Sequence, residues 1–294
     1  AGDTEPRACG LMPAQQLEQI GRRVHKMVAE QSAGIRAVFG QLAEHGLRVL
    51  RTGDWTAEQH SFLRSYFASE VLPVLTPLAV EELKPFPTLP GLVLNVVLSL
   101  VPSEKSGNAD SPPRLAVVPV PPSLPRFIPV PAKEGLCLAV LEDVVAEHVG
   151  LLFEGYEVKA TAVFRLTRDA DVPVTDDDAA DLLRKVEEAV RARRRQGVVR
   201  LAVSASAAPD LKQWLKDWCE VADDDVYEVD GLLDAAALFE IVSRPGFDGL
   251  REREWPPQTP RDLLGHDDLW QAIRDHDVLL VHPYESFQPV VRLV

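Results

Sequence analysis

The segment 163–203 constrains the fold of this chain more than any other stretch. It begins with a mostly apolar run that becomes polar at its end, and it closes with VVRLAV at 198–203, which is typical of a buried strand. Between these runs, Thr175 is a suitable N-cap. Three aspartates at 176–178 fill the expected first helical turn, where the helix dipole favours negative charge. Gly197 ends the helix. The pattern predicts a strand, a helix and a second strand.

Arginines crowd the end of this predicted helix and the strand that follows it. The candidate polyanion-binding residues are Arg191, Arg193, Arg194, Arg195 and Arg200. Guanidinium groups suit the oxygens of a phosphate polymer, so the cluster could bind such a chain. The alternative is structural, because positive charge complements the C-terminal end of a helix dipole. Arg184 and Glu188 are also spaced as a pair on a solvated helix face. We expect the structural role to dominate.

The N-terminal quarter predicts two helices. Apolar residues recur with helical spacing through 13–46, and the spacing of Thr56 and Gln59 marks the start of a second helix over 56–71. Three glycines interrupt the first helix: Gly21, Gly34 and Gly40. Each costs about 1 kcal/mol relative to alanine. Burial of one helix against the other would offset this cost, so we expect a helical hairpin, with the short segment GLRVLR at 46–51 between its arms.

The region 72–265 mixes hairpins with helices. Prolines disfavour helix across 72–90, and the proline-punctuated segment 121–131 suggests a sheet edge. The polar segment Pro102–Pro113 predicts a hairpin loop. Further strands are expected at 93–101, 115–120, 136–140 and 226–229, helices at 142–153, 209–220 and 234–242, and a proline-rich connector at 243–265. Beyond it, a short helix at 267–274 and a strand at 277–281 are expected. This mixture predicts the α+β class.

Charge and cysteine usage restrict the possible partners. The formal net charge is −14, from 45 acidic and 31 basic residues, which argues against a nucleic-acid partner. The cysteines, Cys9, Cys137 and Cys219, lie far apart and show no metal-binding spacing, which favours a reducing, cytoplasmic compartment. The apolar run 89–101 is too short for a membrane span. Neither end of the chain has the pattern of a native terminus, so we interpret it as an excised fragment or a shortened homologue.

Two further motifs allow a chemical interpretation and a structural one. Arg168–Asp171 reads RDAD, and its two carboxylates could hold a magnesium ion. A turn, in which the aspartates bind nearby backbone N–H groups, is the favoured interpretation. The segment 282–287 reads HPYESF, and His282 could suggest a phosphorylated histidine. Here too the structural interpretation is favoured, as a strand end and turn at a domain boundary.

Several of these stretches together resemble a known family. FRLTRDAD at 164–171, the acidic-start and arginine-end helix, and VVRLAV resemble the middle or head domain of the polyphosphate kinases. VYEVDGLLD at 226–234 and RDHDVLLVHPYESFQPVV at 274–291 agree with this. The resemblance runs from about Leu11 onward. It implies three parts: the later part of a helical N-terminal domain at 1–71, the head domain at 72–265, and the start of a phospholipase D-like catalytic domain at 266–294.

The resemblance also implies a function for the whole enzyme, which transfers the terminal phosphate of ATP to polyphosphate reversibly, through a phosphohistidine and with Mg²⁺. In the family that histidine lies downstream of the position of His282, and the adenine contact lies in an upstream NNLDEF-like motif that is not found here. We therefore expect no catalytic, cofactor-binding or metal-binding residue in this chain, which alone would be inactive. It would supply scaffold and subunit contacts in a homo-oligomer, beside the missing catalytic domains. The alternative is a free-standing, non-catalytic polyanion-binding or assembly module.

Overall fold

The structure is a computed structural model of the whole chain, and it describes residues 10–79, 89–103, 113–169, 197–266 and 268–292. The chain divides into two compact units, an N-terminal unit of residues 1–242 and a C-terminal unit of residues 243–294.

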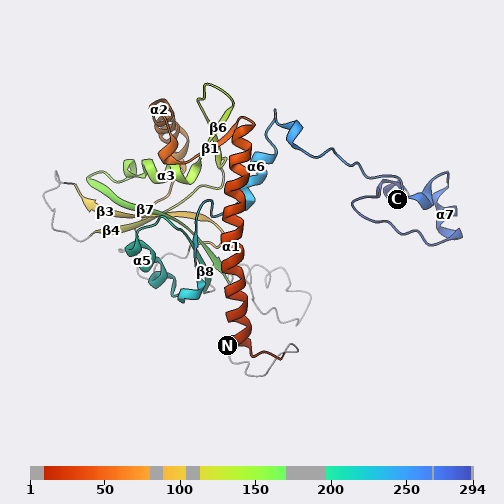
Figure 1. Cartoon of the computed structure of the whole chain (residues 1–294), viewed down its shortest axis with the longest axis horizontal. Coiled ribbons are helices and arrows are strands. Elements are labelled where there is room, and N and C mark those ends of the chain that lie inside the picture. The colour runs from red at the N-terminus through yellow and green to blue at the C-terminus, as the bar shows by residue number, and fades with distance from the viewer. Residues whose placement is uncertain (1–9, 80–88, 104–112, 170–196, 267, 293–294) are drawn as a thin grey trace, which may run out of the picture. The chain divides into compact units, whose positions relative to one another are not determined.

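A six-stranded sheet forms the centre of the N-terminal unit (Figure 1). Its strand order is β2-β4-β3-β7-β8-β9, and every neighbouring pair is antiparallel except β8 and β9. The strands are β2 (Leu78–Ala79), β3 (Leu94–Pro102), β4 (Arg114–Pro119), β7 (Tyr156–Arg168), β8 (Val198–Ser204) and β9 (Val226–Val229). The two strands expected within 163–203 are therefore present and adjacent, as β7 and β8. The helix expected between them, like the loop at 104–112, lies outside the described residues.

A smaller sheet has the order β1-β6-β5. Its strands are β1 (Leu47–Leu50), β5 (Phe127–Val130) and β6 (Leu136–Val140). β1 is parallel to β6, with Leu47 opposite Leu136, and β5 is antiparallel to β6. Pro129 lies in β5, where an edge strand tolerates a residue that cannot donate a hydrogen bond. The sheet edge expected at 121–131 is confirmed.

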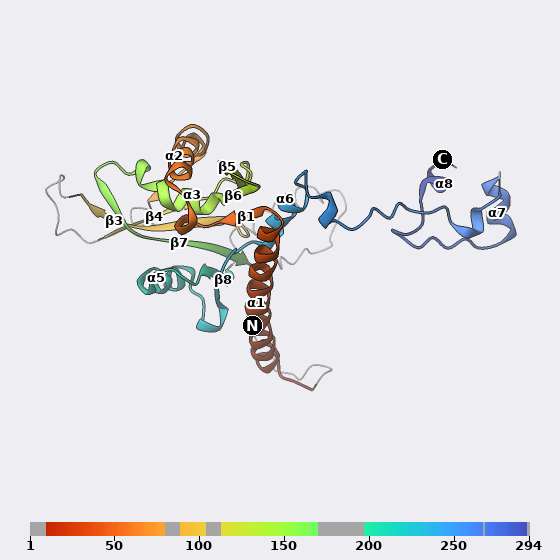
Figure 2. The same cartoon turned by 45° about the horizontal axis from the view of Figure 1, so that its top comes forward.

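Alternation along the strands gives the six-stranded sheet two apolar faces. Val96 and Leu98 of β3 face one core, and Val97 between them faces the other. The first core is covered by α2 (Ala57–Tyr66), its π-helical extension (Phe67–Val71) and α3 (Leu141–His148). The second is covered by α5 (Pro209–Cys219). Figure 2 shows α2 and α3 on one side of the sheet and α5 on the other. The α+β class is confirmed.

Local start signals fix the helix ends. Thr56 Oγ1 accepts from the Gln59 N–H at 3.3 Å, and Gln59 Oε1 accepts from the Thr56 N–H at 2.9 Å, so the expected capping box forms. Asp234 accepts from the Ala236 N–H and begins a 3₁₀ turn (Ala235–Leu238) that continues into α6 (Phe239–Val242). Shorter 3₁₀ turns lie at Thr52–Asp54, Leu72–Val74, Val149–Leu152 and Asp223–Asp225. The turn at Leu72–Val74 is a small departure from the expected absence of helix at 72–90.

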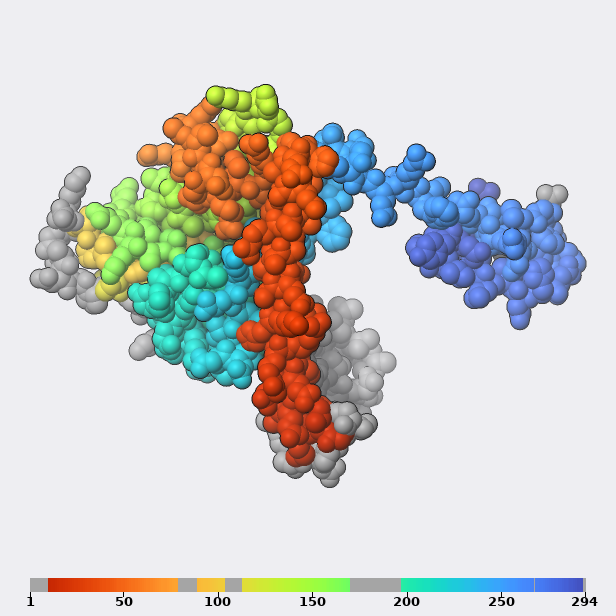
Figure 3. Space-filling model, in the orientation of Figure 1, coloured from red at the N-terminus to blue at the C-terminus, as the bar shows by residue number. Residues whose placement is uncertain are grey.

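The long helix α1 (Pro13–Glu44) is present, but its partners differ from the prediction. It packs mainly on β1 and β9 rather than pairing with α2 as a hairpin. Val24 and Val28 lie against the cluster formed by Ala202, Tyr227 and Val229. The reason is that β1 follows α1 directly and pairs with β6, which separates the two helices. Figure 3 shows α1 in red along the surface of the N-terminal unit. Among the described helices, none combines the length and apolar character that a membrane span requires.

The C-terminal unit is mostly irregular, as expected for the connector at 243–265. Its helical elements are the 3₁₀ turns Asp248–Leu250 and Arg261–Leu263, α7 (Leu269–Asp275) and α8 (Gln288–Val291). The strand predicted at 277–281 is wrong, because no described segment pairs with it. The N–H of Val281 instead donates to the side chain of Glu285, within the same turn. An isolated bridge joins Gln258 to Glu285.

Candidate functional site

Of the predicted arginine cluster, the described residues include Arg200 alone, and the other four members fall outside them. The Arg200 guanidinium carbon lies 4.2 Å from the centre of the Tyr227 ring, and the His25 ring stacks on the same phenol at 4.0 Å. At these distances the Arg200 guanidinium and the His25 imidazole must lie on opposite faces of the Tyr227 ring. Arg200 Nε is buried and has no hydrogen-bond partner. Burial lowers the pKa of Arg200, and neighbouring Arg165 lowers it further. Aromatic contact therefore fixes this side chain.

The RDAD motif is described only up to Asp169. Arg168 Nε donates to the Leu89 carbonyl at 2.8 Å, and the Asp169 N–H donates to the Gly197 carbonyl at 3.0 Å. Both contacts fasten the end of β7 to its surroundings. Across the described parts of the chain, no group of three or more His, Cys, Asp or Glu side chains is arranged to hold a metal ion.

His282 lies in a turn of the C-terminal unit. Its Nδ1 is 3.1 Å from the Glu285 carbonyl oxygen, and its ring contacts Phe287 with centres 5.7 Å apart. The turn expected at this motif is present, whereas the strand expected before it is not.

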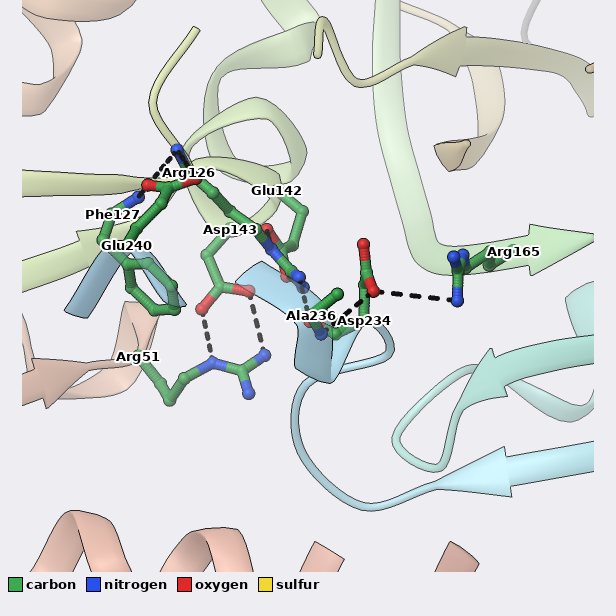
Figure 4. Close-up of polar contacts among 9 residues, drawn as sticks. All are labelled: Arg51, Arg126, Phe127, Glu142, Asp143, Arg165, Asp234, Ala236 and Glu240. Atoms are coloured by element: carbon green, nitrogen blue, oxygen red, sulfur yellow. Dashed lines mark hydrogen bonds and ion pairs between the residues drawn. The ribbon is translucent and has the colours of Figure 1, made fainter. Parts of the chain in front are cut away.

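The densest group of charges in the described N-terminal unit is one that sequence reasoning missed (Figure 4). Arg126, directly before β5, and Glu142, in the first turn of α3, are only 6% and 2% exposed. The guanidinium binds the carboxylate with two nitrogens, including Nε to Oε2 at 2.9 Å. Arg126 also donates to the Asp234 carbonyl. The pair therefore joins β5, α3 and the start of the Asp234 turn.

Glu240 of α6 extends this network. Its carboxylate accepts from two successive backbone N–H groups, those of Arg126 at 3.0 Å and Phe127 at 3.3 Å. The Phe127 donor begins β5, an edge strand, and the Arg126 donor directly precedes it. Asp234 lies 3.7 Å from Arg165 of β7. Glu240 thus attaches α6 to the smaller sheet, and Asp234 attaches the turn before α6 to the six-stranded sheet.

Asp143, the neighbour of Glu142, binds the strand that follows α1. Both of its oxygens accept from Arg51, from Nε at 2.6 Å and from Nη2 at 2.9 Å. Burial by itself would lower the pKa of Arg51, but the hydrogen bonds and charge of Asp143 raise it overall. The Asp143 side chain is 8% exposed and the Arg51 side chain 45% exposed, so Arg51 lies between the carboxylate and the solvent. The end of β1 is therefore fixed to α3.

The members of this network lie far apart in the sequence, which is why no motif pointed to them. A faint signal exists in hindsight. Arg126 stands alone in the apolar, proline-rich segment LPRFIPVP, and Glu142 and Asp143 directly follow a buried strand. Charged residues that interrupt apolar runs are expected to have partners, because an unpaired buried charge is costly.

His148 at the end of α3 gives a pH prediction. Its Nε2 is buried without a partner, and burial lowers its pKa. The unfolded chain therefore takes up a proton at a higher pH than the folded chain does, so stability falls as the pH drops below the ordinary histidine value. In His148→Gln, the loss of unfolding free energy between pH 7 and pH 5 should be smaller than in the wild type. Urea unfolding at the two pH values measures this loss, and His45→Gln, which replaces an exposed histidine, is the control. Equal losses in His148→Gln and the wild type would contradict the assignment.

Comparisons with known proteins agree with this fold. The family model described as the polyphosphate kinase middle domain matches residues 58–241. The polyphosphate kinase of Halalkalibacterium halodurans is 37% identical over 300 residues, which cover 100% of this chain and 42% of that protein. The polyphosphate kinase of Bacillus cereus is 35% identical, with 100% and 43% covered. A crystal structure of polyphosphate kinase from Porphyromonas gingivalis shares the fold, with a TM-score of 0.71 and 21% identity over 95% of this chain and 41% of that one.

The chain thus spans about two-fifths of the length of the curated relatives that it matches. The family model covers more than half of its residues, from α2 to α6. Within that range lie both sheets except β1, together with most of the charge network. On these grounds, the chain belongs to the polyphosphate kinase family.

Proposed function

We propose that this chain is the later N-terminal part and the head portion of a polyphosphate kinase. The whole enzyme would transfer the terminal phosphate of ATP to polyphosphate reversibly, through a phosphohistidine and with Mg²⁺, in the cytoplasm. Residues 1–71 would close the helical N-terminal domain, 72–265 form the head, and 266–294 begin the first catalytic domain. This chain would supply the scaffold and the subunit contacts of a homo-oligomer, while phosphate transfer would belong to the catalytic domains.

One observation carries the scaffold role. Arg126 and Glu142, two of the buried charged residues that the structure describes in the N-terminal unit, bind each other. Asp143 likewise has both oxygens bound to Arg51. A catalytic or phosphate-binding group must present its polar atoms to a ligand. These groups instead join β1, β5, α3 and α6, which is what a rigid support for neighbouring domains requires.

The purified 294-residue chain should therefore form no polyphosphate from ATP and Mg²⁺. It should also take up no acid-labile ³²P from labelled ATP. A full-length polyphosphate kinase of the family, assayed alongside, is the positive control. An acid-labile label on any of the seven histidines would contradict the assignment of the chemistry to other domains. Sedimentation of the same sample tests the subunit contacts, and a chain that stays monomeric at all concentrations would argue against them.

A further inference from the structure

A pocket of about 290 Å³ lies in the N-terminal unit between α1, β1 and the turn after β9. Its lining residues are Ser32, Ile35, Arg36, Phe39, Val49, Arg51, Asp230, Gly231 and Leu232. The volume is at the lower end of those found for ligand sites, so it suits a molecule of one or two rings. The scaffold role proposed above uses one lining residue, Arg51, through its contact with Asp143, and it leaves the pocket itself without a role.

The floor of the pocket is apolar. Ile35 and Phe39 contribute from two successive turns of α1, and Val49 and Leu232 contribute from the N-terminal unit's body. The polar side chains of the lining, Ser32, Arg36, Arg51 and Asp230, are called the rim. A small apolar body placed here would remove these side chains from water, which is the main favourable contribution to binding at such a site.

The rim presents a fixed guanidinium. Arg51 uses Nε and Nη2 to bind Asp143, and its remaining nitrogen, Nη1, makes no hydrogen bond to any described residue. Figure 4 shows that nitrogen turned away from the Asp143 carboxylate. Because Asp143 is buried and holds Arg51 in one orientation, binding a ligand oxygen at Nη1 would order no further side chain.

The other polar side chains of the rim are two donors, Ser32 and Arg36, and one carboxylate, Asp230, which is paired with Arg36. The Ser32 hydroxyl can donate a hydrogen bond. Arg36 pairs with Asp230 at 2.7 Å, and both side chains are more than 60% exposed, so this pair is weak and can rearrange at little cost. Ionised acceptors form the stronger hydrogen bonds with a guanidinium, which favours a carboxylate over a neutral carbonyl at Arg51.

We propose that this pocket binds a small organic acid, with its apolar body against Phe39, Ile35 and Leu232 and its carboxylate at Arg51 Nη1. Such a ligand would contact α1, β1 and the turn after β9 together. Binding would therefore stabilise the docking of α1 on the rest of the N-terminal unit, because a ligand that binds one state favours that state.

Titration of the full chain with 2-naphthoate tests the proposal, followed by ¹H–¹⁵N NMR. Binding should be saturable, with the largest shifts at the amides of Val49, Gly231 and Leu232. The neutral analogue 2-naphthamide should bind about tenfold more weakly, as expected for the loss of one charge-assisted hydrogen bond at a half-exposed site. Equal affinity for acid and amide, or shifts centred elsewhere, would overturn the proposal.

Matched variants locate the site. Ser32→Phe should fill the pocket and abolish the naphthoate shifts, whereas Gln31→Phe, at the adjacent exposed position, should leave them unchanged. Ile35→Trp is a second filling variant in case the first does not fold. Arg51→Lys keeps the positive charge beside Asp143 but removes the guanidinium with its several donors. It should lower the affinity for 2-naphthoate more than the affinity for 2-naphthamide. Wild-type affinity in a folded filling variant would refute the site.

Discussion

Glu142→Leu should lower the unfolding free energy of the N-terminal unit by about 3–5 kcal/mol, because it leaves the Arg126 charge buried without its carboxylate. Arg126 is 6% exposed, so water cannot replace the missing partner. Urea unfolding followed by tryptophan fluorescence measures the effect. This is the largest loss that we expect from removing a single polar group in the described residues.

Two companion variants make this result specific. Removing Glu18, which pairs with Arg22 on α1 where both side chains are more than 60% exposed, should change stability by less than about 0.5 kcal/mol. The double variant Arg126→Met with Glu142→Leu should recover much of the loss, since well-packed apolar residues can replace a buried pair. A Glu142→Leu variant as stable as the wild type would contradict the role of this pair.

Gly135→Ala should also be strongly destabilising. Gly135 has a φ of +70°, and a Cβ built there would lie 2.3 Å from the Gly46 carbonyl oxygen. That oxygen also accepts from the Leu136 N–H at 2.8 Å, at the start of the β1–β6 pairing. Left-handed backbone in a non-glycine residue together with this contact should cost at least about 2 kcal/mol. Thermal unfolding is the measurement.

Gly34→Ala is the matched control for this glycine. Gly34 lies inside α1, and a Cβ added there meets nothing within 4 Å. The substitution should stabilise the helix by up to about 1 kcal/mol, because alanine has the higher helix propensity. If Gly135→Ala were as harmless as Gly34→Ala, the close approach of Gly46 and Gly135 would not be a constraint on the fold.

Local features of the fold could be predicted from the sequence because their causes are local. The caps at Thr56 and Asp234 depend on side chains two or three residues from the groups they bind. The hairpin β3–β4 follows from alternating apolar runs on either side of a polar loop. In each case the residues that form the pattern and the residues they contact lie close together in the sequence.

The features that escaped prediction depend on distant partners. The pairing of β1 with β6 and the place of α1 are set by segments that no periodicity connects. The same holds for the candidate site. Arg51, Arg126, Asp143 and Glu240 come from four separate elements, and only the fold brings them together. The strand predicted at 277–281 failed for the opposite reason, since an apolar run alone does not supply a neighbouring strand.

The position of α1 has a consequence for synthesis of the protein. His25 on α1 binds the Asp224 carbonyl, 199 residues later, and stacks on Tyr227. At 5–20 residues per second, a ribosome needs about 10–40 s to make that stretch. During this interval the helix has left the ribosome before its β9 contacts exist, so Val24 and Val28 stay in water or on a chaperone. The contacts of α1 with β9 therefore form only after residues 224–229 have been made, whereas its contacts with β1 can form earlier.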